Sequence, residues 1–161
     1  VMASDITTGS PLSCHSSTTF GNPSYSEAKA ILNLSKMVLG EFDNVGCITF
    51  MPGEGSEDLI RKYSDQIEKF SNTKETLFLV DLFGGSPYNA AARLAFGNSN
   101  IEVVTGVNVP MLLELLDARE SVENIKELVR IAIESGTSGI KSFTDILESV
   151  NDSLDEKDED L

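Results

Sequence analysis

Residues Leu77–Ala95, LFLVDLFGGSPYNAAARLA, decide how this chain folds. They begin with a continuous apolar run that delivers Asp81 into a glycine turn, after which Ser86 and Pro87 lead into a helix. A continuous apolar strand is typical of a parallel sheet that is covered on both faces. Ligands bind such sheets at the carboxyl edge of the strands, where helix N-termini favour anions. The stretch therefore predicts a carboxylate, a hydroxyl and backbone N–H groups at one anion-binding edge.

Strand and helix patterns alternate on both sides of this stretch. The expected strands are VMAS at residues 1–4, Val45–Met51, Thr76–Val80 and Ile101–Thr105. Six helices are expected. The first runs from Glu27 to about Gly40, the second from its N-cap Ser56 to about Phe70, and the third over Asn89–Phe96. The fourth begins at about Pro110, and the last two cover Val122–Ser135 and Ile140–Val150. This alternation predicts one α/β domain with an open, mainly parallel sheet of about four strands and helices on both faces.

Composition divides the chain into three parts. Residues 1–26 are rich in Ser, Thr, Gly and Pro, and we interpret them as a divergent segment with a truncated first strand followed by a loop. Residues 27–147 form the predicted domain, and residues 148–161, ending DEKDEDL, form an acidic tail that we expect to be disordered. Because this acidic ending shows no linker leading into a further domain, we expect any partner domain to be on a separate chain.

Charge and apolar patterning limit the compartment and the partners. The net charge of −14 argues against nucleic acid, since phosphate backbones require a basic surface, and it suits a basic protein partner. The chain has no apolar run of membrane-spanning length and no N-terminal secretory pattern, which predicts a cytoplasmic protein. Its two cysteines, Cys14 and Cys47, have no CxxC spacing and are expected to be free thiols.

Several common catalytic motifs are missing from the sequence. There is no GxxxxGK[ST], no GxGxxG, no GxSxG and no paired metal-ligand spacing, so a nucleotide, a serine-hydrolase triad and a metal are all poorly supported. Gly84 and Gly85 either make a tight turn only or admit a phosphoryl or carboxylate group, and their place directly after a buried LVD favours the second. An aspartate orients an imidazole ring, a task open to Asp81 if His15 reaches it.

Four segments resemble a known family in order and spacing. They are KMVLGEFDNV, FMPGEGSEDLIRKY, TLFLVDLFGGSPYNAAARLA and IEVVTGVNVPMLLELLDARE, and with them the resemblance covers about residues 27–141. They resemble the mannose-family EIIA domains of the bacterial phosphotransferase system (PTS). Such domains accept a phosphoryl group from the carrier HPr on a histidine and pass it to a IIB domain. The IIB domain phosphorylates sugar at a membrane complex, so the IIC and IID subunits are only indirect partners.

This resemblance implies a doubly wound α/β fold, a homodimer, and no metal or organic cofactor. It maps the aspartate beside the active histidine onto Asp81 and a phosphate-facing hydroxyl onto Ser86, with the N–H groups around Gly84 and Gly85 neutralising the phosphoryl oxygens. The chain is thus predicted to be a cytoplasmic phosphotransferase that forms a phosphohistidine.

The acceptor histidine is where the chain departs from this family. The family's first strand ends in Ser or Thr, His and Gly, whereas VMAS is followed by Asp5, and an ungapped count back from MVLGE reaches Ser24. Three interpretations remain. His15, the single histidine, loops into the cleft and carries the phosphoryl group; Asp5 stands at the acceptor position, although two facing carboxylates are unfavourable; or the domain is a catalytically impaired regulatory or assembly module.

Overall fold

The computed structural model describes residues 12–16, 27–40, 42–70 and 75–147, and for residues 12–16 and 27–29 it describes the backbone alone. The elements alternate along the chain in the order β1 (Leu12–Ser16), α1 (Glu27–Leu39), β2 (Val45–Thr49), α2 (Ser56–Lys69), β3 (Thr76–Val80), α3 (Ser86–Ala95), β4 (Ile101–Thr105), α4 (Val109–Ala118) and α5 (Ile125–Ser138). A short helical segment follows at residues 143–147. The predicted α/β class with a parallel sheet is confirmed.

The strands of the described chain form one parallel sheet in the order β2-β1-β3-β4. β1 pairs with β2 on one side, where Cys14 lies opposite Cys47 and His15 opposite Ile48. On its other side β1 pairs with β3, where His15 lies opposite Val80. Because both neighbours run in the same direction as β1, the carboxyl ends of these strands meet at one edge of the sheet.

The position of the first strand differs from the sequence prediction. The predicted strand, VMAS, lies outside the described residues, as does the predicted acidic tail, and Leu12–Ser16 lies in what was interpreted as a loop. The sequence LSCHS has one large apolar residue and no alternation, so hydrophobic periodicity gives no strand signal there. Pairing on both sides satisfies the backbone N–H and C=O groups of β1 whatever its side chains are. β1 is therefore a strand of the same sheet as β2 and β3.

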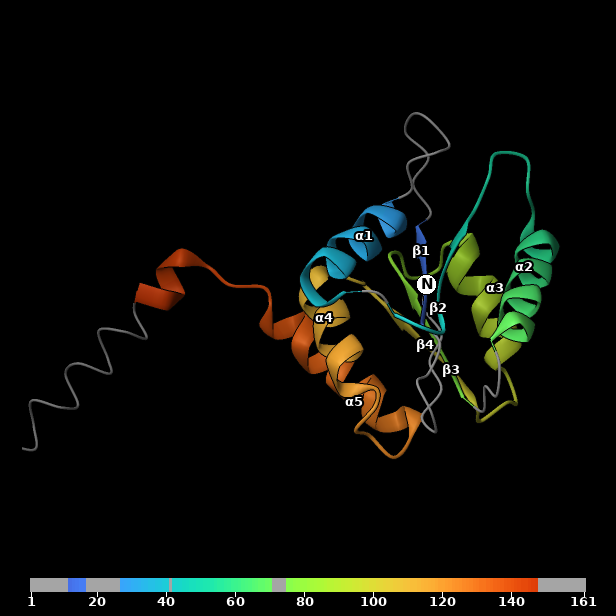
Figure 1. The fold of residues 1–161 in the computed structure, drawn as a ribbon. Coiled ribbons are helices and arrows are strands. Elements are labelled where there is room, and N and C mark those ends of the chain that lie inside the picture. The colour runs from blue at the N-terminus through green and yellow to red at the C-terminus, as the bar shows by residue number, and fades with distance from the viewer. Residues whose placement is uncertain (1–11, 17–26, 41, 71–74, 148–161) are drawn as a thin grey trace, which may run out of the picture.

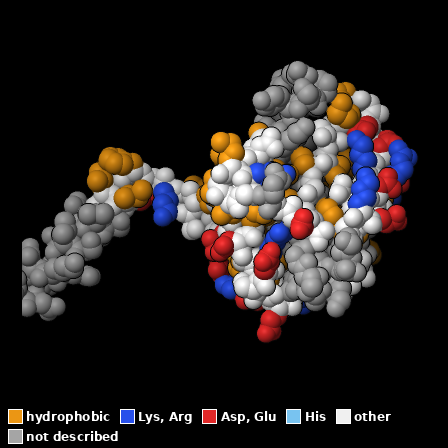
Figure 2. All heavy atoms as spheres, viewed as in Figure 1, with side chains coloured by type: hydrophobic (Ala, Val, Ile, Leu, Met, Phe, Trp, Pro, Cys, Tyr) orange, Lys and Arg blue, Asp and Glu red, His pale blue; other side chains and the backbone are white. Residues whose placement is uncertain are grey.

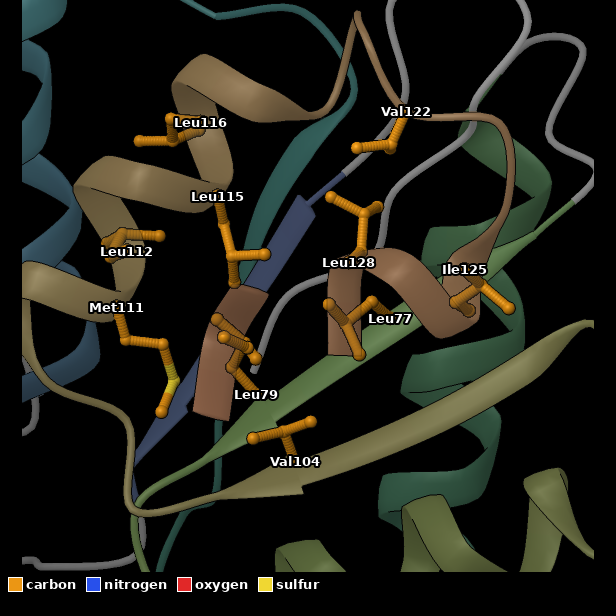
Figure 3. Packing of buried hydrophobic residues seen from close by; sticks show 11 residues of the cluster. Leu77, Leu79, Val104, Met111, Leu112, Leu115, Leu116, Val122, Ile125 and Leu128 are labelled. Carbon is orange, nitrogen blue, oxygen red and sulfur yellow. The ribbon is translucent and has the colours of Figure 1, made fainter. Parts of the chain in front are cut away.

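Two hydrophobic clusters attach the helices to opposite faces of the sheet. α1, α4 and α5 lie on one side and α2 and α3 on the other (Figure 1). On the first side, Leu77, Leu79 and Val104 of the sheet pack against leucines of α4 and α5 (Figure 3). On the other side, Phe78 and Val80 pack against Leu59 and Tyr63 of α2. All five residues of β3 are buried, as a strand covered on both faces requires.

Several helix boundaries differ from the prediction by a few residues. α3 begins at Ser86, three residues earlier than expected, because Pro87 fits the first turn, where a backbone N–H has no intrahelical partner. The N-cap of α2 is Gly55 and not Ser56, and the Asp58 carboxylate accepts a hydrogen bond of 3.0 Å from the Gly55 N–H. Of the predicted helix Ile140–Val150, residues 143–147 are helical and residues 148–150 lie outside the described residues. In the described ranges, every helix is too short or too polar to cross a membrane.

Candidate active site

Asp81 is the first residue after the buried strand β3, and its main chain is tied to the neighbouring strand. Its carbonyl oxygen accepts a hydrogen bond of 3.2 Å from the N–H of Gly106, and the Val80 carbonyl accepts one of 3.2 Å from the N–H of Val107. One carboxylate oxygen, Oδ1, accepts a bond of 2.8 Å from the N–H of Leu82. The side chain of Asp81 is half-buried. A carboxylate is therefore held at the carboxyl edge of the sheet, as the sequence predicts.

The glycine turn after Asp81 leads directly into α3. Gly84 has a φ of 77°, a left-handed conformation that glycine adopts without strain. Gly85 is the N-cap of α3, and Ser86 is its first residue and is half-buried. The first N–H groups of a helix have no intrahelical partner and attract anions. The predicted residues Gly84, Gly85 and Ser86 thus form one helix N-terminus beside Asp81.

Side-chain hydrogen bonds fix this turn from two directions. Asn89, on the second turn of α3, donates from Nδ2 to the carbonyl oxygen of Gly84 at 3.0 Å. From α2, the buried hydroxyl of Tyr63 donates to the carbonyl oxygen of Pro87 at 3.2 Å. Burial and the nearby charge of Asp81 raise the pKa of Tyr63, so its hydroxyl keeps its proton and remains a donor. The turn is consequently positioned by side chains of both α2 and α3.

The end of β4 meets the same edge. Gly106 has a φ of 79° and donates its N–H to Asp81, as described above. Asn108 caps α4 by accepting a hydrogen bond of 3.0 Å from the N–H of Met111, and it also donates to the Gly136 carbonyl of α5 at 3.0 Å. The loop after β4 is therefore anchored to two helices.

The loop after β2 is held by a charged pair. Lys62 of α2 forms an ion pair with Glu54 and donates to the Thr49 carbonyl at 2.9 Å. Glu54 also accepts a hydrogen bond of 2.8 Å from the N–H of Met51. The hydrogen bond from Lys62 is the main cause that lowers the pKa of Glu54 below its ordinary value. These contacts close the glycine-containing loop Pro52–Gly55 against α2.

Of the two candidate acceptor residues, the structure describes the position of His15 but not that of Asp5. His15 is the fourth residue of β1 and lies in register with Val80, the residue before Asp81. It therefore occupies the carboxyl end of a central strand and not a loop. Asp5, the alternative acceptor, lies outside the described residues.

Sequence reasoning missed the residues that support the turn. Tyr63 falls within the helix predicted from Ser56 to about Phe70 without a role of its own, and Asn89 was expected only as the start of a helix. An asparagine near the start of a helix that follows a glycine turn is only a weak signal for a bond to that turn. The Tyr63–Pro87 bond gives no local signal, because it joins residues 24 positions apart. Within the described ranges no group of three His, Cys, Asp or Glu side chains could hold a metal ion. The absence of a metal or organic cofactor stays a prediction.

The fold is an α/β domain whose candidate site lies at the carboxyl ends of parallel strands, where Asp81 adjoins the N-terminus of α3. A family model described as "PTS system fructose IIA component" matches residues 24–133. Curated relatives agree with it. The chain is 49% identical over 116 residues to the mannose-specific EIIAB component of Escherichia coli K12, an alignment that covers 72% of this chain and 36% of that protein. It is 37% identical over 120 residues to the sorbose-specific EIIA component of Lacticaseibacillus casei, covering 73% and 86% of the two chains.

Solved structures give the same result. The crystal structure of the EIIA component from Streptococcus agalactiae superimposes with a TM-score of 0.68 at 30% identity, over 82% of this chain and 95% of that one. The chain belongs to the PTS EIIA family of the mannose, fructose and sorbose type. It spans about a third of the length of the E. coli relative.

Proposed function

We propose that this chain is a PTS phosphocarrier that accepts a phosphoryl group from HPr on His15 and passes it to a IIB protein. The observation that carries this proposal is the register of the central strands, which pairs His15 with Val80 and so brings its backbone beside the residue that precedes Asp81. Family membership supports the same reaction, because EIIA components are phosphotransferases in general. The reaction belongs in the cytoplasm, and the membrane subunits IIC and IID take part only indirectly.

In the proposed transfer, an imidazole nitrogen of His15 attacks the phosphorus of the phosphohistidine of HPr. A new N–P bond forms as the N–P bond of the donor breaks, and the HPr imidazole leaves with the bonding electron pair. Each ring keeps its remaining N–H, so no net proton is transferred. Transfer of this kind depends mainly on positioning and on electrostatic stabilisation of the phosphoryl oxygens.

The other predicted residues have distinct roles in this transfer. Asp81 accepts a hydrogen bond from the second imidazole nitrogen, which fixes the ring and its tautomer. The hydroxyl of Ser86 and the N–H groups around Gly84 and Gly85 stabilise the equatorial oxygens at the start of α3. The transfer needs no metal or organic cofactor, and the net charge of −14 argues against nucleic acid as a partner.

A phosphorylation assay tests the assignment. The chain is incubated with phosphoenolpyruvate, enzyme I and HPr, and its intact mass is measured before and after brief acid treatment. We expect the mass of one phosphate to be added and then lost in acid, and we expect His15→Ala to prevent the addition. An increase that survives His15→Ala and is removed by Asp5→Ala would instead identify Asp5 as the acceptor.

A second function is favoured by one specific observation. The family model matches residues 24–133, so His15 lies outside the matched part of the chain. We therefore retain the alternative of an EIIA-like regulatory or assembly module that lacks a working acceptor. In the same assay this alternative predicts no added phosphate on the unmodified chain, while a known EIIA protein in a parallel reaction becomes phosphorylated.

We also propose that the protein is a homodimer. Large apolar side chains are exposed after α5, with Ile140, Phe143, Ile146 and Leu147 on a segment that leaves the body of the domain (Figures 1 and 2). Met37 and Val38 of α1 are exposed as well. Large exposed apolar side chains grouped on one segment are typical of a protein–protein interface, and a second copy of the chain would cover those that follow α5.

A further inference from the structure

Two large apolar side chains stand exposed next to the candidate active site. Leu82 is 60% exposed and Phe83 is 71% exposed, although the five residues of β3 that precede Asp81 are all buried. They occupy the short turn between Asp81 and Gly84. Within the described domain, the main chain therefore turns apolar side chains outward at the point where the proposed reaction takes place.

These side chains are held in place. Phe83 packs against Tyr88 of α3 with a distance of 4.7 Å between ring centroids. The N–H of Leu82 donates to Asp81, and its carbonyl accepts a hydrogen bond of 3.4 Å from the N–H of Gly85. An exposed aromatic residue that is already ordered loses little conformational entropy on binding, which is characteristic of residues that dominate a binding interface.

The proposed reaction determines what must come near these residues. Phosphoryl transfer requires reacting atoms about 3–3.5 Å apart, so the donor protein must place its phosphohistidine within contact distance of the Asp81 edge. A protein surface that reaches this edge also covers the adjoining turn. We propose that Leu82 and Phe83 form the apolar contact by which HPr docks, an inference that rests on the proposed function.

Charge indicates the chemistry of the matching surface on HPr. The chain carries a net charge of −14, so long-range attraction favours a partner with a basic surface. At the centre of the contact, the exposed Leu82 and Phe83 would pack against an apolar patch on HPr. The partner surface that fits is therefore a small apolar patch beside the phosphohistidine, surrounded by basic side chains.

The test compares the double variant Leu82→Ala/Phe83→Ala with Phe96→Ala. Phe96 is 92% exposed and follows α3 at the end remote from the glycine turn, so its truncation removes a similar apolar surface away from the site. Binding of isotope-labelled unphosphorylated HPr is measured by NMR titration. Phosphorylation rates are then measured with phosphorylated HPr and with phosphoramidate, a small donor that needs no protein docking.

We expect the double variant to weaken HPr binding and to lower kcat/KM with phosphorylated HPr by about tenfold or more, the size expected when central interface residues are truncated. Its rate with phosphoramidate, and both rates of Phe96→Ala, should be unchanged. Unchanged HPr binding in the double variant would overturn the docking proposal, as would equal losses with both donors. If the unmodified chain binds HPr but neither donor phosphorylates it, the proposed function fails while the docking surface is still tested by the titration.

Discussion

The hydroxyl of Tyr63 and the carbonyl oxygen of Pro87 form a buried hydrogen bond of 3.2 Å that links α2 to the first turn of α3. The Tyr63 ring also packs against Phe78 of β3, with ring centroids 5.0 Å apart. One side chain thus joins a helix, the central sheet and the turn that carries Ser86. Tyr63 is a positioning residue, because it acts on the site through Pro87.

Replacing Tyr63 by phenylalanine should remove this bond and leave the ring packing intact. We expect the free energy of unfolding, measured with urea, to fall by about 1 kcal/mol, the usual net value of a hydrogen bond. Phosphorylation by HPr should slow as well, since the start of α3 loses a support. Tyr88→Phe, which keeps the ring beside Phe83, serves as the control. An unchanged midpoint and an unchanged rate for Tyr63→Phe would contradict this role.

Asp81→Asn should slow phosphorylation while the domain stays folded. The amide oxygen can still accept the N–H of Leu82, but the side chain no longer carries the charge that orients and stabilises a protonated or phosphorylated imidazole. We expect a rate loss of about a hundredfold, at the lower end of general acid–base effects. Asp117→Asn, an exposed residue near the far end of α4, should keep the original rate. Equal rates for the two variants would argue against Asp81 as the orienting group.

The Glu54–Lys62 pair gives a pH-dependent contribution to stability. The pKa of Glu54 is lowered in the folded protein, chiefly by the Lys62 hydrogen bond, so the stabilisation is fully present above the unfolded value of about 4.3. It is lost as the pH falls through the lowered folded pKa. Glu54→Gln should therefore be less stable than the unmodified chain at pH 7, and the difference should shrink toward pH 3.

Urea unfolding at both pH values measures that difference. Glu68→Gln, which alters an exposed carboxylate on α2, the helix that carries Lys62, is the control. A stability loss in Glu54→Gln that is equally large at pH 3 and pH 7 would show that packing, and not the charge of Glu54, holds the loop.

The proposed dimer predicts a concentration-dependent mass that depends on the segment after α5. Phe143→Ser/Ile146→Ser should shift the protein to the monomer in sedimentation velocity, since both side chains are exposed and apolar in the single chain. Phe83→Ala, which truncates an exposed ring at the other proposed surface, should leave the mass unchanged. A monomeric mass for the unmodified chain at all accessible concentrations would refute the dimer.

Much of this fold is predictable because hydrophobic periodicity is strong from Glu27 onward. β3 and β4 match their predicted boundaries, and Asp81, Gly84, Gly85 and Ser86 come together as expected because they are neighbours in the sequence. Local chemistry is enough to place such residues.

β1 and the supporting hydrogen bonds were not predictable, because they depend on contacts between distant parts of the chain. LSCHS has no apolar pattern, and its place in the sheet comes from backbone pairing with strands about 30 and 65 residues away. The bonds from Tyr63 to Pro87 and from Asn108 to Gly136 likewise join distant parts of the chain. Such contacts exist only once the helices have packed on the sheet.

The central claim is that His15, at the end of β1, carries the phosphoryl group. It is tested most directly by phosphorylating the chain with HPr, digesting it at alkaline pH to preserve the N–P bond, and locating the phosphate by tandem mass spectrometry. The account predicts a phosphate on the peptide containing LSCHS, assigned to His15. A phosphate on any other residue, or none on a chain that binds HPr, would contradict it.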